Sequence, residues 1–169
     1  AEAKPTHFDI QPMEAAFRAM TLLCARREYC THDIREKLRT RELSPDETSA
    51  ILERLQQEGY INNARYARAY AHDKLLYDGW GRIKIAQSLR LKRISDNLVQ
   101  EALDELSEEQ SLDTLRRVVR SKQRSVKGKT PYETRQKLAR SVIHRGFEPS
   151  LVFKEIGHSD EDAADDWMD

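Results

Sequence analysis

The sequence predicts an all-α protein made of three tandem three-helix repeats that form an elongated, curved rod. The 169 residues include only six Gly and five Pro, and β-branched residues are few, which is unlike an all-β chain. Stretches of helical length, with apolar residues at helical spacing, lie between these Gly and Pro residues. A register of apolar positions that recurs roughly every 50 residues indicates the repeats.

The register aligns five sets of three apolar or small residues. In chain order the sets are Ile34, Ile85 and Leu138; Leu38, Leu89 and Val142; Leu43, Ile94 and Phe147; Thr48, Val99 and Val152; and Leu52, Leu103 and Ile156. Because residues i and i+4 share one face of a helix, each set is expected to face a core. Leu, Ile, Val and Phe make up only 36 of the 169 residues, which suits three small cores better than one large core.

Nine helices are expected, three in each repeat. They lie at 12–28, 32–42 and 45–58 in repeat one (12–61), at 63–77, 82–92 and 96–107 in repeat two (62–107), and at 108–126, 131–145 and 149–157 in repeat three (108–158). Residues 159–169 form an acidic segment whose composition predicts disorder.

Residues near the expected helix ends support these bounds. Pro45 and Pro149 are expected at the first position of a helix, where a missing N–H group costs nothing. Thr31 and Ser95 are expected as N-caps. Gly59 is expected to end its helix in the left-handed region of the backbone map.

Charge is unevenly distributed, although 29 Lys and Arg balance 29 Asp and Glu to a formal charge of zero. Residues 159–169 hold six acids and no base, so residues 1–158 carry +6. Residues 82–93 hold five bases and no acid, and residues 111–147 hold eleven Lys and Arg against two acids. Neutrality of the whole chain therefore does not exclude a nucleic-acid partner.

The basic second helices predict a stripe that contacts phosphate backbones without reading their sequence, or that contacts an acidic protein groove. The candidates for binding DNA or a protein–DNA filament are Arg35, Lys37, Arg39, Arg82, Lys84, Arg90, Lys92, Arg93, Arg116, Arg117, Arg120, Arg135, Lys137 and Arg140. Trp80 is the one aromatic candidate for a contact, with packing between repeats as its alternative role. The acidic segment suggests weak autoinhibition by folding back onto this stripe.

The sequence gives no indication of catalysis. A glycine-rich phosphate loop, a nucleophile motif and a His-x-x-x-His pair are all missing, so no enzymatic activity, metal site or cofactor is expected. Cys24 and Cys30 match neither a disulfide framework nor a zinc spacing and are expected to be free thiols in a reducing cytoplasm. Without a signal-peptide or membrane-spanning pattern, a cytoplasmic location is expected.

Over about residues 13–157 the chain resembles the RecX family, whose members regulate the RecA recombinase. The most specific segments are Gly59-Tyr60-Ile61-Asn62-Asn63-Ala64-Arg65-Tyr66-Ala67-Arg68-Ala69-Tyr70 and Gly79-Trp80-Gly81-Arg82-Ile83-Lys84-Ile85, the latter followed by Leu89 and Ile94. Upstream, Ala25-Arg26-Arg27-Glu28 with Arg35, Lys37 and Leu38 resembles the first unit of the family. The resemblance implies a monomeric, non-enzymatic protein of tandem three-helix repeats. It also implies binding in the groove of a RecA–single-stranded DNA filament, binding to single- and double-stranded DNA without strong sequence preference, and inhibition of RecA in recombination, DNA repair and the SOS response.

The chain departs from the family pattern at two places. Asn62 and Asn63 replace two acids, and Asn63 is expected to keep a helix-capping role. Arg82 replaces a proline and adds a cation. A helix-turn-helix transcription regulator is the alternative function, because three-helix units with a basic helix also suit it; it predicts a dimer with a sequence-selective site. A purely structural helical-repeat adaptor, which predicts no DNA binding, is the third alternative.

Overall fold

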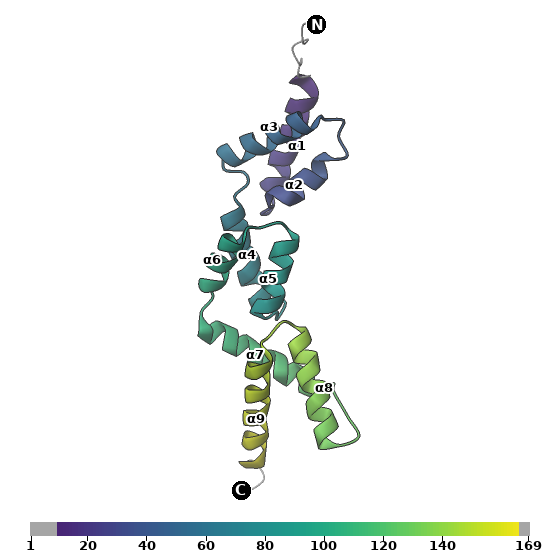
Figure 1. Cartoon of the computed structure of the whole chain (residues 1–169), viewed down its shortest axis with the longest axis vertical. Coiled ribbons are helices and arrows are strands. Elements are labelled where there is room, and N and C mark those ends of the chain that lie inside the picture. The colour runs from purple at the N-terminus through teal and green to yellow at the C-terminus, as the bar shows by residue number, and fades with distance from the viewer. Residues whose placement is uncertain (1–9, 166–169) are drawn as a thin grey trace. The chain divides into compact units, whose positions relative to one another are not determined.

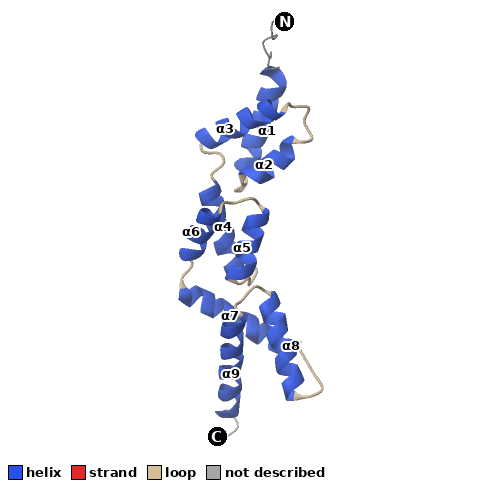
Figure 2. Ribbon diagram, in the orientation of Figure 1, coloured by secondary structure: helices blue, strands red, loops and turns tan. Residues whose placement is uncertain are grey.

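The computed structural model describes residues 10–165, which form nine helices joined by turns and loops and contain no strand (Figures 1 and 2). In chain order the helices are α1 (Ile10–Cys24), α2 (Thr31–Leu38), α3 (Pro45–Gln57), α4 (Asn63–Leu76), α5 (Arg82–Leu91), α6 (Asp96–Asp104), α7 (Glu108–Gln123), α8 (Pro131–His144) and α9 (Pro149–Asp165). The predicted all-α class is confirmed. Apart from the end of α9, every helix begins and ends within about four residues of its expected bound, the usual error of such assignments.

The last helix is longer than the sequence predicts. α9 continues to Asp165, so the backbone is helical over 159–165, where the composition predicts disorder. Gly157 lies inside this helix, because one interior glycine costs only about 1 kcal/mol relative to alanine and does not end a helix by itself. The rest of the acidic segment, 166–169, lies outside the described residues.

The chain divides into two compact units. The first holds the residues up to Ala67 together with Lys92–Ile94, and the second holds Arg68–Leu91 and the residues from Ser95 onward. In the first unit α3 packs against α1 and α2. In the second unit α5 packs against α6, while α7, α8 and α9 pack against one another (Figure 1).

The repeated register marks the buried positions of these small cores. None of the six residues in the Ile34 and Leu38 sets is more than 4 % exposed. Of all fifteen positions, only Leu43, Thr48 and Leu103 are half-buried. Leu43 and Thr48 both belong to repeat one, so the core of that repeat is the least covered at its α2–α3 turn.

Three of the expected helix-end residues have the predicted roles. Pro45 and Pro149 are the first residues of α3 and α9, and Gly59 has a φ of +78° after α3. Ser95 occupies the N-cap position of α6 with an extended backbone, but its side chain makes no capping hydrogen bond.

The N-terminus of α2 differs from the prediction. The N-cap is Cys30, whose Sγ accepts a hydrogen bond from the Asp33 N–H group at 3.5 Å. Thr31 is instead the first helical residue, and its N–H and hydroxyl groups donate to the Asn63 Oδ1 atom at 2.9 and 3.2 Å. A side chain from the start of α4 thus satisfies a backbone donor that the first turn of α2 leaves unpaired.

The capping role expected of Asn63 belongs to its neighbour. Asn62 Oδ1 accepts a hydrogen bond from the Arg65 N–H group at 3.0 Å, which makes Asn62 the cap of α4. Asn63 is left to bind Thr31. Both asparagines therefore act as acceptors through their Oδ1 atoms, a role that needs an oxygen atom rather than a negative charge.

Repeats two and three meet where two backbones approach closely. The turn after α8 packs against the start of α5, and the Gly81 and Ile83 N–H groups donate to the Arg145 and Gly146 carbonyls at 2.8 and 3.1 Å. A Cβ atom on Gly81 would overlap the Gly146 carbonyl group, and a Cβ atom on Gly146 would overlap Lys84. The junction therefore requires two glycines.

We expect Gly81→Ala to lower the free energy of unfolding by about 1–3 kcal/mol, because the added methyl group forces the two backbones apart. Gly157→Ala is the control, since no atom lies within 4 Å of its Cβ position and alanine favours the helix by about 1 kcal/mol. Urea unfolding followed by circular dichroism measures both. A Gly81→Ala variant as stable as the wild type would show that the junction does not require glycine at this position.

Candidate nucleic-acid interface

Several candidate binding residues instead hold the fold together. The half-buried Arg82 donates to the Leu106 carbonyl at 2.8 Å and to the Ser111 hydroxyl at 3.4 Å. Arg117 donates to the carbonyl of Leu76, the last residue of α4, at 2.7 Å. A guanidinium group at a helix C-terminus satisfies an unpaired carbonyl and opposes the negative end of the helix dipole. These two arginines link repeats two and three.

Lys92 has a comparable role beside repeat one. Its Nζ atom lies 2.6 Å from the Asp33 Oδ1 atom, and its carbonyl accepts from the Cys30 thiol at 3.9 Å. Burial alone would raise the pKa of the Asp33 carboxyl group, but hydrogen bonds with Lys92 and Cys30 and the Lys92 charge hold this pKa below its usual value. Burial raises the pKa of the Cys30 thiol to about 11, so Cys30 is a packed cap rather than a reactive group.

Other candidates form ion pairs at the surface. These pairs join Arg39 to Glu36 at 3.4 Å, Arg90 to Asp96 at 3.1 Å, Arg116 to Glu155 at 3.2 Å and Lys137 to Glu133 at 3.4 Å. Exposed pairs contribute roughly 0–1 kcal/mol. An anion could displace the carboxylates of the three more exposed pairs at little cost, whereas the Glu155 carboxylate, paired with Arg116, is only 16 % exposed.

Three exposed arginines of the predicted stripe, Arg35, Arg120 and Arg140, have no ion-pair partner among residues 10–165. Arg135 is also exposed on α8. Arg93 is exposed too, but it occupies the turn after α5 with a φ of +56°, a conformation that only glycine adopts freely.

Aromatic rings hold two of the candidate lysines. The Lys37 Nζ atom lies 5.4 Å from the centre of the Tyr29 ring, and the Lys84 Nζ atom lies 4.3 Å from that of Trp80. Lys74 approaches the half-buried Trp80 ring to 4.7 Å. Lys74 belongs to α4 and Lys84 to α5, so cation–π attraction to the Trp80 ring holds the two helices to the turn between them.

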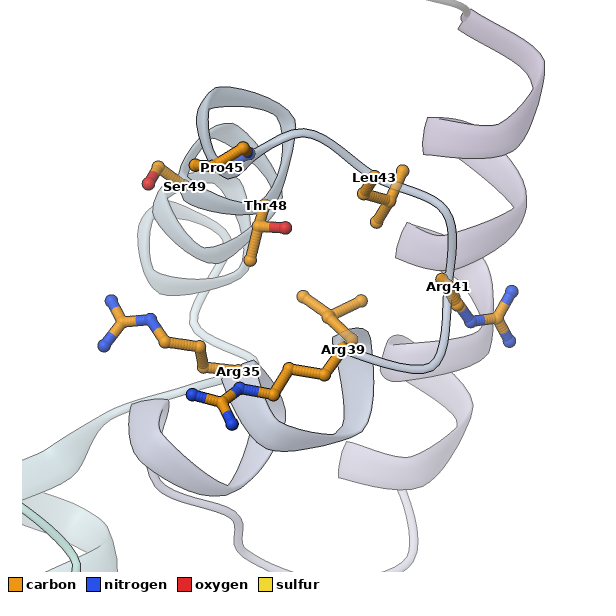
Figure 3. A pocket seen from close by; sticks show the side chains of 8 residues that line it. Arg35, Arg39, Arg41, Leu43, Pro45, Thr48 and Ser49 are labelled. Carbon is orange, nitrogen blue, oxygen red and sulfur yellow. The ribbon is translucent and has the colours of Figure 1, made fainter.

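The structure gathers basic side chains into two local groups. In repeat one, Arg35 of α2 and Arg39, the residue that follows α2, lie on one side of a hollow of about 530 Å³. Arg41 lies at the opposite rim, with its guanidinium group pointing away from the hollow (Figure 3). In repeat three, a second hollow of about 360 Å³ is lined by Lys122, Lys137, Ser141, His144, Arg145 and Arg140. Each group places several cations within reach of one segment of a polyanion.

Three of these cations are missing from the sequence-based candidates: Arg41, Lys122 and Arg145. The repeat register holds a signal for two of them. Arg41, Lys92 and Arg145 each lie three residues after the register positions Leu38, Leu89 and Val142. A basic residue therefore recurs at the end of every second helix. Lys122 lies on α7, the helix that also holds the candidates Arg116, Arg117 and Arg120, and the register gives no signal for it.

Two features are missing from the part of the chain that the structure describes. Over residues 10–165, no helix combines the length and the apolar character that crossing a membrane requires. Among the described side chains, those of residues 11–157, His, Cys, Asp and Glu nowhere cluster in threes that could hold a metal ion.

Two family models match this chain. They describe the second three-helix domain of RecX, at residues 62–103, and the third three-helix domain of RecX, at residues 108–156. A regulatory protein RecX from Halorhodospira halophila is 29% identical over 151 residues, which are 88% of this chain and 91% of the relative. A regulatory protein RecX from Legionella pneumophila is 29% identical over 152 residues, which are 87% of this chain and 98% of the relative.

The fold also has a solved counterpart. The crystal structure of RecX from Lactobacillus salivarius superposes with a TM-score of 0.78 at 18% sequence identity and covers 89% of this chain and 98% of the other. A second crystal structure of a regulatory protein RecX gives the same TM-score at 21% identity and covers 93% and 81%. At these identities the likeness shows the fold.

We expect Arg82→Ala to lower the urea midpoint of unfolding, because it leaves the Leu106 carbonyl without its donor, at a cost of about 1–3 kcal/mol. Arg120→Ala, which removes an exposed arginine without an ion pair from the neighbouring α7, should shift the midpoint by no more than about 0.5 kcal/mol. Equal effects of the two substitutions would contradict the division into structural and exposed cations.

We expect the stability conferred by the Lys92–Asp33 pair to depend on pH. A carboxyl group whose pKa is lowered by folding stabilises the protein above its unfolded pKa of about 3.9 and loses this contribution as the pH falls through the folded value. Asp33→Asn should therefore be less stable than the wild type at neutral pH, with a difference that shrinks in acid. Unfolding midpoints across a pH series measure this, and a pH-independent difference would refute it.

Proposed function

The chain belongs to the RecX family of regulatory proteins, and we propose that it inhibits the RecA recombinase by binding along the RecA–single-stranded DNA filament. In this proposal the chain binds recombinase and DNA together and slows ATP hydrolysis and strand exchange. It thereby moderates homologous recombination, DNA repair and the SOS response in the cytoplasm.

The arrangement of the cations carries the proposal. Arg35, Arg39 and Arg41 surround the hollow of repeat one, and Lys137 and Arg140 lie in the hollow of repeat three. Each repeat offers only a few exposed cations, so one repeat alone would hold a polyanion weakly. Several such contacts on one chain act together through a high effective concentration, which favours a long, regular partner such as a filament.

The chemistry of these contacts favours DNA binding without sequence selectivity. Arginine and lysine side chains at the hollows can pair with phosphate oxygens, which fix position and carry no sequence information. Phosphate contacts also release counterions, so the affinity should fall steeply as salt rises. The chain would then bind single- and double-stranded DNA alike, unlike a helix-turn-helix regulator that reads one site.

We expect the purified chain, at ratios well below one per RecA monomer, to reduce DNA-dependent ATP hydrolysis and strand exchange by RecA. A chain that bridges filament subunits affects many subunits at once, which is the reason for the low ratio. The rate of ATP hydrolysis on preformed filaments is the measurement. No inhibition at any ratio would reject the proposal.

We expect Arg140→Glu to weaken DNA binding and to lower the slope of log affinity against log salt by about one. Lys154→Glu is the matched control, because it makes the same change in net charge at an exposed position of α9 that lines neither hollow. Fluorescence anisotropy with labelled single-stranded DNA measures both. Equal losses would mean that net charge, not the hollow of repeat three, governs binding.

A further inference from the structure

The α2–α3 turn of repeat one lacks a contact that its counterparts make. In the register, Leu43 corresponds to Ile94 and Phe147, which are 4 % and 6 % exposed. Leu43 itself is half-buried. In the other two repeats, a preceding repeat lies next to this turn. Within residues 10–165, no repeat precedes repeat one, so Leu43 stays partly exposed where Ile94 and Phe147 are buried.

The basic residue of the same turn, Arg41, also lacks a contact that its counterparts make. Lys92 is held by Asp33 at 2.6 Å, and Arg145 donates to the Asp78 carbonyl at 2.9 Å. Their counterpart in repeat one, Arg41, is exposed and has no ion pair or hydrogen bond from its side chain in the described part of the chain. Both the apolar and the basic group of this turn are therefore available to a partner.

The turn borders the hollow shown in Figure 3. Leu43 and Pro45 supply the accessible apolar surface, because Leu38 is only 1 % exposed. The Thr48 side chain points into the space beside them. Arg35 and Arg39 extend from α2 along one side, and Arg41 lies at the opposite rim (Figure 3). The volume of about 530 Å³ is enough for one or two large side chains.

The charges at the hollow define the partner. No acidic side chain lines it, and Glu36 pairs with Arg39 alone. A phosphate group would satisfy the arginines but would leave the half-buried Leu43 and the exposed Pro45 uncovered. A peptide that combines several carboxylates with a large apolar side chain would satisfy both parts of the surface.

The chain itself contains a segment with this composition. Residues 160–169 read Asp-Glu-Asp-Ala-Ala-Asp-Asp-Trp-Met-Asp and hold six acids and no base around Trp167 and Met168. We propose that the C-terminal segment 160–169 of a second copy binds the hollow, with Trp167 or Met168 on the apolar surface and the carboxylates beside Arg35 and Arg41.

This contact would join unlike surfaces of two copies. A head-to-tail contact does not close on itself, so it produces open chains of copies as the concentration rises. The chain, which the sequence predicts to be a monomer, would associate in this way as its concentration rises. The association should weaken as the salt concentration rises, because exposed charges contribute much of its free energy. It needs no DNA and no recombinase, so its test is independent of the proposed function.

Sedimentation velocity of the full-length chain over a range of concentrations tests the proposal. The sedimentation coefficient of the wild type should rise with concentration at low salt. A pocket variant, Arg35→Glu with Arg41→Glu, and a tail variant, Trp167→Ala with Met168→Ala, should each lose this rise. The control is Arg18→Glu with Lys154→Glu, two exposed positions away from the hollow, which matches the charge change of the pocket variant and should keep the rise. Circular dichroism checks that all variants fold.

A mixture of the two variants gives the sharper result. The pocket variant keeps an intact tail and the tail variant keeps an intact hollow, so an equimolar mixture should form dimers and nothing larger. A fluorescein-labelled peptide of residues 158–169 should bind the tail variant and should bind the pocket variant at least about tenfold more weakly. The proposal is overturned if the wild type stays monomeric, if the pocket variant still associates, or if the mixture does not.

Discussion

The close approach of two backbones at Gly81 and Gly146 is the constraint on which the junction of repeats two and three depends. Two hydrogen bonds join the end of α8 to the start of α5, and neither glycine leaves room for a side chain. The contact places the C-terminal carbonyls of one second helix against the N-terminal donors of another, so each satisfies groups that the other leaves unpaired. Three-helix units with small cores can then stack by backbone contacts without a large apolar interface.

Contacts between repeats also decide what several of the basic residues do. Where a second helix ends against another repeat, its last cation is used in the contact, as Lys92 binds Asp33 and Arg145 binds the Asp78 carbonyl. Arg82 and Arg117 are likewise held by main-chain carbonyls. Fewer cations are therefore free for a polyanion than the run of basic residues suggests. Some of the remaining ones line the hollows of repeats one and three, and others, such as Arg120 and Arg135, are exposed elsewhere.

Much of the fold could be predicted from the sequence, because the signals are local. Gly and Pro mark helix ends, and the register at Leu38, Leu89 and Val142 marks positions that prove to be buried. The roles of individual polar residues could not be predicted. These roles depend on segments that are distant in the sequence. One example is the cap of α2, which is Cys30 and not Thr31, and another is Arg82, which binds the Leu106 carbonyl. Arg41 is a different case, because its position in the register equals that of Lys92 and the sequence therefore contains the signal that identifies it.

In the proposed function, the exposed cations of α2 and α8 face the partner while the cations at the junctions hold the fold. Hydrogen–deuterium exchange of the chain, alone and bound to RecA filaments on single-stranded DNA, distinguishes these two groups. Exchange should slow on binding in peptides that cover α2 with its following turn and α8, with little change at Gly81 and Gly146, whose N–H groups are hydrogen-bonded within the chain. Slower exchange confined to other helices, with α2 and α8 unchanged, would contradict it.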